Sequence, residues 1–193
     1  EVRIWNTALT QAEIQSYMST SPTGNEEDLA AHWNFNEGTG TTASDVTSND
    51  NDGTIYGATW STDVPPVDPP PPPPNDDNYS LSFDGEDDLV SFQNAVIPMT
   101  GDVSVQVWAY AEENNGYSNM VTQGDPTVGA YFISYESDDQ MRISHEWSDI
   151  NVTYPFGVWV QITVVKNDDG TKLYFDGQLV AETTSTMLPT ENP

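Results

Sequence analysis

The chain has 193 residues, of which 31 are acidic and 4 are basic, so its formal net charge is −27. This balance excludes nucleic acid as a partner and excludes binding to anionic membranes, since both need clusters of Lys and Arg. The absence of cysteine excludes disulfides, thiolate metal sites and a cysteine nucleophile. So acidic a surface suits calcium, high salt or neutral ligands such as sugars. No apolar run long enough for membrane insertion and no signal peptide are visible.

The first sixty residues predict short strands and one helix. Val2 to Trp5 is a short apolar strand, and Thr10-Gln-Ala-Glu13 is a capping box that opens a helix to about Met18. Two further strands are expected at residues 29–35 and 53–60, and residues 37–52 between them form a polar loop.

Residues 65–78 are the one low-complexity segment. Six prolines, Pro69 to Pro74, follow Pro65-Pro-Val-Asp68 and precede Asn75-Asp-Asp-Asn78. Prolines in series favour the polyproline II conformation, at about 3.1 Å per residue, and act as a semi-rigid spacer. The segment is therefore the predicted boundary between two parts of the chain, and it should run outside any sheet.

Two Phe-Asp-Gly turns organise the rest of the chain. Leu81 and Phe83 alternate with serines in a strand that ends at Asp84-Gly85, and a second strand follows at residues 89–92. Residues 172–181 contain the second Phe-Asp-Gly turn and are expected to form a hairpin around Asp176-Gly177.

The remaining strands alternate clearly between apolar and polar residues. They are expected at residues 103–110, 120–122, 131–135, 141–145 and 159–165. Short strands at regular spacing predict an all-β fold, an antiparallel two-sheet jelly-roll β-sandwich with one short helix as an addition.

Five stretches resemble the laminin-G-like jelly rolls of the concanavalin A-like lectin/glucanase superfamily in their bacterial form. They cover most of the chain outside the proline segment. They are residues 1–9 with Glu13-Ile14, residues 33–38, residues 45–58, residues 81–90 and residues 158–180.

The order of these stretches suggests modules in tandem. In such modules the Phe-Asp-Gly strands come early and the Val-Arg-Ile-Trp strand comes late. Residues 1–64 then resemble the C-terminal part of one module, residues 65–78 are the linker, and residues 79–193 resemble the N-terminal part of the next. The alternative is one module over 29–193 with the prolines as an inserted loop. The sequence leaves both open, and in either case residues 79–193 need another segment to complete their sheet edges.

One loop offers hard oxygen ligands at short spacing. Residues 45–53 are rich in Asp, Asn and Ser, which suits Ca²⁺, although the spacing is not that of an EF-hand. An ordinary turn feeding a strand is the alternative, and a structural calcium is implied by the family resemblance. A second candidate is Glu86-Asp87-Asp88. The expected ligands of the first site are Asp45, Asn49, Asp50 and Asp52.

A sugar ligand needs aromatic faces with polar neighbours. Trp108 and Trp159 lie in apolar strands and match core positions of the resembled family, so they are expected to be structural. The expected ligand patch, which could equally cover an edge of the core, is Trp147, Tyr154, Tyr117, His145 and Asp149.

No catalytic residues are expected. Glucanases of the resembled superfamily carry paired carboxylates on one strand. The nearest match begins at Glu136, and its second Glu is missing. No nucleophile motif accompanies the two histidines, His32 and His145.

The sequence and the resemblance together predict a non-catalytic, secreted or cell-surface module of a large multidomain bacterial protein. Its role would be adhesion or carbohydrate binding, with calcium as a structural aid. Its partners would be a glycan or another cell-surface protein, and neighbouring modules of the same chain. A structural spacer or stalk repeat is one alternative, and an accessory carbohydrate-binding domain of a polysaccharide-degrading enzyme is another.

Overall fold

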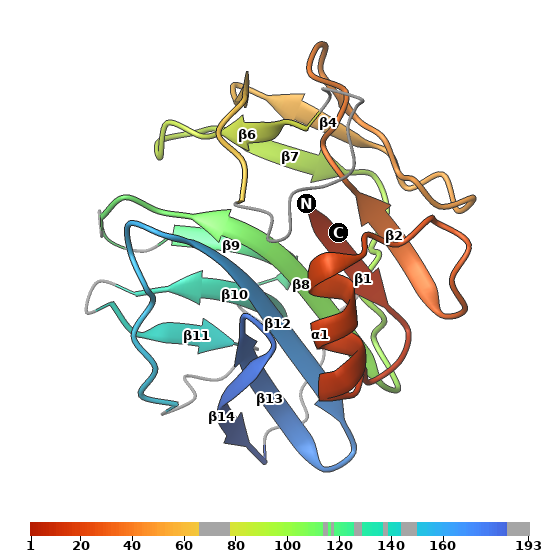
Figure 1. The fold of residues 1–193 in the computed structure, drawn as a ribbon, viewed down its shortest axis with the longest axis vertical. Helices are drawn as coiled ribbons and strands as arrows, with labels where there is room; N and C mark the ends of the chain where they lie inside the picture. The colour runs from red at the N-terminus through yellow and green to blue at the C-terminus, as the bar shows by residue number, and fades with distance from the viewer. Residues whose placement is uncertain are drawn as a thin grey trace.

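A computed structural model describes residues 1–65, 78–113, 116, 118–125, 129–136, 139–143 and 150–184. The predicted proline segment, apart from its ends, therefore lies outside the described residues. Figure 1 shows antiparallel sheets with one short helix, α1, lying across the largest of them. Among the described residues, no helix is long and apolar enough to cross a membrane.

The largest sheet has six strands in the order β14-β13-β12-β8-β1-β2. It joins strands from both sides of the proline segment, because β1 lies between β2 and β8. Its strands are β1 (Val2–Trp5), β2 (Leu29–Trp33), β8 (Val103–Tyr110), β12 (Trp159–Asn167), β13 (Gly170–Phe175) and β14 (Gln178–Thr183).

Three smaller sheets complete the described part of the fold. One has the order β11-β10-β9, another the order β3-β4-β7, and a third pairs β5 with β6. Their strands are β3 (Thr42–Ala43), β4 (Gly53–Tyr56), β5 (Thr59–Ser61), β6 (Ser80–Ser82), β7 (Leu89–Phe92), β9 (Ser118–Asp125), β10 (Gly129–Tyr135) and β11 (Met141–Ile143).

The main hydrophobic core lies on one face of the six-stranded sheet, packed against the smaller sheets. Alternation places every second residue of a strand on this face, so Val105 of β8 and Ile162 of β12 are buried there. Ile133 of β10 and Ile55 of β4 enter the same core from the smaller sheets. The predicted all-β antiparallel sandwich is confirmed.

The opposite face of the six-stranded sheet carries the predicted helix, α1 (Gln11–Ser19). Thr10 and Glu13 form the expected capping box, in which each side chain accepts from the backbone of the other residue. Ile14 is fully buried and packs in a second core with Trp5 and Tyr174. We name this side of the sheet the helix-side face.

The predicted hairpin at Asp176-Gly177 is confirmed. Both turn residues have positive φ, 47° and 69°, and Phe175 pairs with Gln178 across them. A two-residue turn with two positive φ angles matches the natural twist of paired strands, and a glycine at the second position removes the steric cost.

Residues 80–92 form two strands that follow each other in the chain, as expected. The two strands do not pair with each other as a hairpin would. β6 pairs with β5, and β7 pairs with β4. The expected strand over residues 53–60 is likewise broken, at Gly57 and Ala58. A Cβ at Gly57 would lie 1.8 Å from the Asp88 carboxylate. The acidic loop between β6 and β7 therefore contacts the chain where β4 ends, and only glycine fits at position 57.

Candidate functional site

The predicted metal loop is held together by the carboxylate of Asp45. Its Oδ1 accepts hydrogen bonds from the backbone N–H of His32 and Thr47, at 3.1 and 2.9 Å. Its Oδ2 accepts from the Thr47 hydroxyl at 2.8 Å and from the Asn51 backbone at 3.1 Å. Four donors occupy this carboxylate, so Asp45 stabilises the loop directly and has little capacity left for an ion.

Asn49 also has a structural role. Its side-chain amide donates to the backbone carbonyl of Ala30 at 2.9 Å, and the Asn51 amide donates to the same oxygen at 3.2 Å. The Trp33 indole donates to the Asn51 carbonyl at 2.8 Å. The loop is thereby fastened to β2 and to the core.

A small polar cavity lies between this loop and the segment that follows β7. Its volume is about 150 Å³. Two of the four predicted metal ligands, Asp50 and Asp52, line it, and Asp45 and Asn49 do not. Carboxylate and amide oxygens from two segments form the donor set that Ca²⁺ prefers. The lining residues are Asp50, Asn51, Asp52, Phe92, Gln93, Asn94 and Val96.

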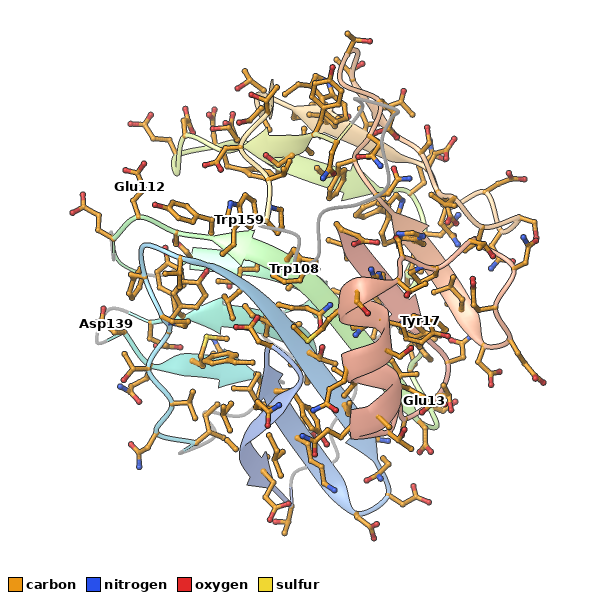
Figure 2. The ribbon with its side chains drawn as sticks, viewed as in Figure 1. Glu13, Tyr17, Trp108, Glu112, Asp139 and Trp159 are labelled. Carbon is orange, nitrogen blue, oxygen red and sulfur yellow. The ribbon has the colours of Figure 1, made fainter. Side chains whose placement is uncertain are left out.

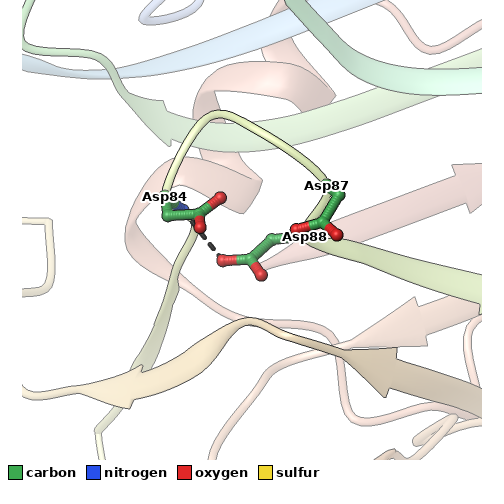
Figure 3. A group of neighbouring side chains, drawn as sticks. All are labelled: Asp84, Asp87 and Asp88. Atoms are coloured by element: carbon green, nitrogen blue, oxygen red, sulfur yellow. Dashed lines mark hydrogen bonds between the residues drawn. The ribbon is translucent and has the colours of Figure 1, made fainter.

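A second acidic group lies in the loop between β6 and β7, where the sequence indicated Glu86, Asp87 and Asp88. Figure 3 shows Asp84, Asp87 and Asp88, whose carboxylates lie within 4.8 Å of one another. Asp88 Oδ2 accepts from the Asp84 backbone N–H at 2.8 Å, and Asp84 Oδ1 accepts from the Glu86 N–H at 2.9 Å. The group is largely exposed, and its bonds are those of an acidic turn.

The predicted ligand patch is not assembled by the described residues. Tyr117, His145, Trp147 and Asp149 lie outside them. Tyr154 is 1% exposed and packs against Tyr135 and Phe156, so its ring has no open face for a sugar. Burial also raises the pKa of Tyr154. For Tyr154 the position agrees with the alternative reading of the patch, that its residues cover an edge of the core.

Trp108 and Trp159, which the family resemblance matched to core positions, lie on the helix-side face together with Tyr110. Trp108 and Tyr110 share this face of β8, and Trp159 of β12 lies directly opposite Tyr110. The Trp159 and Tyr110 rings are 5.8 Å apart at 49°, and Tyr110 is 40% exposed. Both tryptophans are half-buried and lie outside the two hydrophobic cores, so their match to core positions is not confirmed, and their structural role stays a prediction. Figure 2 labels both side chains. We name Trp108, Tyr110 and Trp159 the aromatic surface.

Polar groups accompany this surface. The Trp159 indole donates to Asp63 Oδ1 at 3.3 Å. Gln161 lies opposite Trp108 in the register, is 1% exposed, and neither its amide nitrogen nor its amide oxygen has a hydrogen-bond partner among the described residues. Aromatic rings beside hydrogen-bonding groups provide both contacts that a sugar ring needs, an apolar face and polar partners.

A charged cluster lies further along the same face, beside the helix. The Arg3 guanidinium donates from Nε to Glu1 Oε1 at 2.9 Å, and its Nη2 lies 2.8 Å from Oε2. His32 Nε2 lies 2.5 Å from Glu1 Oε1, and Arg3 and His32 are both buried. Burial alone would raise the pKa of Glu1, but the hydrogen bond from His32 and the charge of Arg3 hold it well below its usual range.

Glu136, the start of the nearest match to a glucanase motif, is buried. Its Oε1 lies 3.9 Å from Arg142 Nε. The geometry is that of an ion pair inside the fold.

The comparisons with known proteins bear on the family. The family model described as "Concanavalin A-like lectin/glucanases superfamily" matches residues 84–193, more than half of the chain. The crystal structure of an S-layer domain-containing protein (residues 221–444) from Clostridium thermocellum is 20% identical to the chain. The match covers 82% of this chain and 74% of that one at a TM-score of 0.37, which is too low to support an argument about function. The search of curated proteins gave no match.

Proposed function

The chain belongs to the concanavalin A-like lectin/glucanases superfamily, and from this premise we propose that it is a non-catalytic, secreted or cell-surface module that binds neutral glycans. The observation that carries the proposal is the aromatic surface on the helix-side face. A tryptophan and a tyrosine lie opposite each other there, and an aspartate and a buried glutamine are their neighbours.

The charge of the chain supports a neutral ligand. At a formal net charge of −27, sulfated or otherwise acidic glycans are repelled over the whole surface. Pyranose rings carry no charge, and their C–H faces can stack on indole and phenol rings. The alternative of an accessory domain of a polysaccharide-degrading enzyme uses the same surface and differs only in its neighbouring domains. The spacer alternative rests on the proline run and predicts no binding.

Trp159→Ala and Tyr110→Ala are each expected to weaken glycan binding at least about tenfold, because truncating a central aromatic residue of a binding site typically costs more than 1.4 kcal/mol. A glycan array, followed by titration calorimetry with the strongest neutral binder, measures this loss.

The matched control is Tyr56→Ala. Tyr56 is 55% exposed on β4, away from the helix-side face, and its removal should leave the affinity unchanged. Binding that survives both Trp159→Ala and Tyr110→Ala would place the glycan elsewhere. No binding to any glycan on the array would favour the spacer alternative.

Calcium remains a proposal for this chain, and the cavity beside Asp50 and Asp52 is where the geometry supports it best. At a hundredfold excess over its Kd, a bound ion stabilises the folded state by about 2.7 kcal/mol. For a chain of this size that corresponds to a melting temperature about 5–10 °C higher than in EDTA. Magnesium should restore little of the difference, because it demands tighter octahedral geometry.

Two variants separate the ion from the loop. Asp50→Asn with Asp52→Asn should abolish the calcium response, whereas Asp45→Asn should lower the melting temperature equally with calcium and with EDTA. Sodium chloride controls for simple screening of the negative charge. A full calcium response in the Asp50→Asn, Asp52→Asn variant would contradict this placement.

A further inference from the structure

The chain contains the acceptor motif for N-linked glycosylation, Asn-x-Ser/Thr with any residue except proline in the middle, at two places. The first is Asn78-Tyr-Ser80 and the second is Asn151-Val-Thr153. An aspartate stands two residues before each asparagine, so the surrounding sequence does not separate the two motifs. Both asparagines are exposed, and the motifs differ in how the fold holds their other residues.

The motif at Asn78 is built into the fold. Ser80 belongs to β6 and is only 9% exposed, and its hydroxyl donates a hydrogen bond to the Asp63 carbonyl. The Tyr79 backbone N–H donates to Asn36 Oδ1 at 3.3 Å. The motif requires a hydroxyl on its third residue, so a transferase has to contact that hydroxyl as well as the asparagine amide. At Ser80 the hydroxyl is covered, and its proton is already donated within the fold.

The motif at Asn151 lies at the surface. Asn151 is outside the strands, between β11 and β12, with a φ of 46° that asparagine tolerates better than most residues. No other described residue forms a hydrogen bond or an ion pair with its side chain. Thr153 is exposed, and its hydroxyl oxygen accepts a hydrogen bond from the Gln140 amide at 3.2 Å. A hydroxyl that accepts still has its own proton to donate, so both groups that a transferase has to contact are accessible in the folded chain.

We propose that Asn151 is a site of N-linked glycosylation and that Asn78 is not modified in the folded chain. The donor is an oligosaccharide joined through a diphosphate to a lipid. Asn151 Nδ2 forms a bond to the anomeric carbon of the first sugar, and the bond from that carbon to the diphosphate oxygen breaks. The lipid diphosphate leaves, and one amide proton passes to a base of the transferase.

This inference rests on the secreted or cell-surface location in the proposed function, since enzymes that recognise the motif act on exported chains. It does not depend on glycan binding at the aromatic surface, because neither motif includes a residue of that surface. The two assays can therefore fail independently of each other.

The test uses the purified, folded chain with an oligosaccharyltransferase and a lipid-diphosphate-linked oligosaccharide. Two isolated peptides, residues 74–82 and residues 147–155, are incubated in parallel, and the enzyme chosen is one that modifies both. The peptides lack the fold, so they show that both motifs are acceptors when nothing covers them. Peptide mass spectrometry should then find the oligosaccharide on Asn151 of the folded chain and not on Asn78.

Two variants test the role of the hydroxyl. Thr153→Val should abolish the modification of the folded chain, because it removes the hydroxyl and leaves a side chain of similar shape. Ser80→Ala is the matched control, and it should leave the modification at Asn151 unchanged. An unmodified Asn151 in the folded chain, or an oligosaccharide on Asn78 of the folded chain, would contradict the proposal.

Discussion

Arg3→Met is expected to lower the free energy of unfolding by about 3–5 kcal/mol, because it leaves the Glu1 carboxylate without its bidentate partner in a largely buried position. The Arg3 side chain is 3% exposed and that of Glu1 is 19% exposed. Arg3 also donates to the Tyr17 carbonyl at 2.7 Å near the end of α1, so the substitution loosens the helix as well. Urea denaturation followed by fluorescence measures the loss.

The double variant Glu1→Gln, Arg3→Met provides the control. Removing the charge together with its partner should recover part of the stability, because an unpaired buried charge is the main cost. A loss below about 1 kcal/mol for Arg3→Met, as is typical of exposed ion pairs, would show that solvent reaches the cluster.

The same cluster gives a pH dependence with a definite sign. The pKa of Glu1 is lower in the folded chain than its usual value of 4.5, so its contribution to stability is complete above that value. It is lost as the pH falls from 4.5 towards the folded-state pKa. Arg3→Met should reduce the part of the acid destabilisation that comes from Glu1, which chemical denaturation at pH 3 and pH 6 compares.

Trp33→Ala is expected to cost about 3–5 kcal/mol, the usual range for removing a large aromatic side chain from a core. Trp33 is 1% exposed, contacts Phe92 and donates a hydrogen bond to the Asn51 carbonyl. Because Phe92 lies beyond the proline segment, both parts of the chain should unfold in one transition at a lower denaturant concentration.

Trp60→Ala is the matched control for this substitution. Trp60 is only half-buried, and its indole donates to the Gly40 carbonyl near the surface, so a smaller loss is expected. Calorimetry that resolved two transitions, with only one of them shifted by Trp33→Ala, would show that residues 1–65 and 78–184 fold independently. The predicted division at residues 64 and 79 into parts of two tandem modules would then be favoured, and until such a test it stays a prediction.

Local patterns predicted the elements of this fold well. Two local motifs are the capping box at Thr10 and Glu13 and the turn at Asp176-Gly177. Each depends only on residues close together in the sequence. The partners of β6 and β7 could not be predicted in the same way. Leu81 and Val90 are separated by a turn signal typical of a hairpin, yet long-range packing pairs their strands with β5 and β4.

Strand parity in the sequence indicates the aromatic surface. Val105, Val107 and Ala109 share one parity in β8, and Trp108 and Tyr110 have the other, so alternation alone places them on opposite faces. The family resemblance favoured a core position for Trp108, whereas strand parity places it on the helix-side face, where it lies beyond the second core and is half-buried. The roles of Asp45 and Asn49 could not be read from composition, because an acceptor of backbone hydrogen bonds and a calcium ligand require the same residue types.

The most direct test of glycan binding at the aromatic surface follows the indole N–H signals of ¹⁵N-labelled protein as a neutral oligosaccharide from the array is added. We expect the Trp159 signal to shift with the binding isotherm, because its N–H faces Asp63 at the surface. The signals of Trp5 and Trp33 should stay in place, since both indoles are buried and bonded inside the fold. Saturable glycan binding with an unmoved Trp159 signal would show that the glycan does not bind at the aromatic surface.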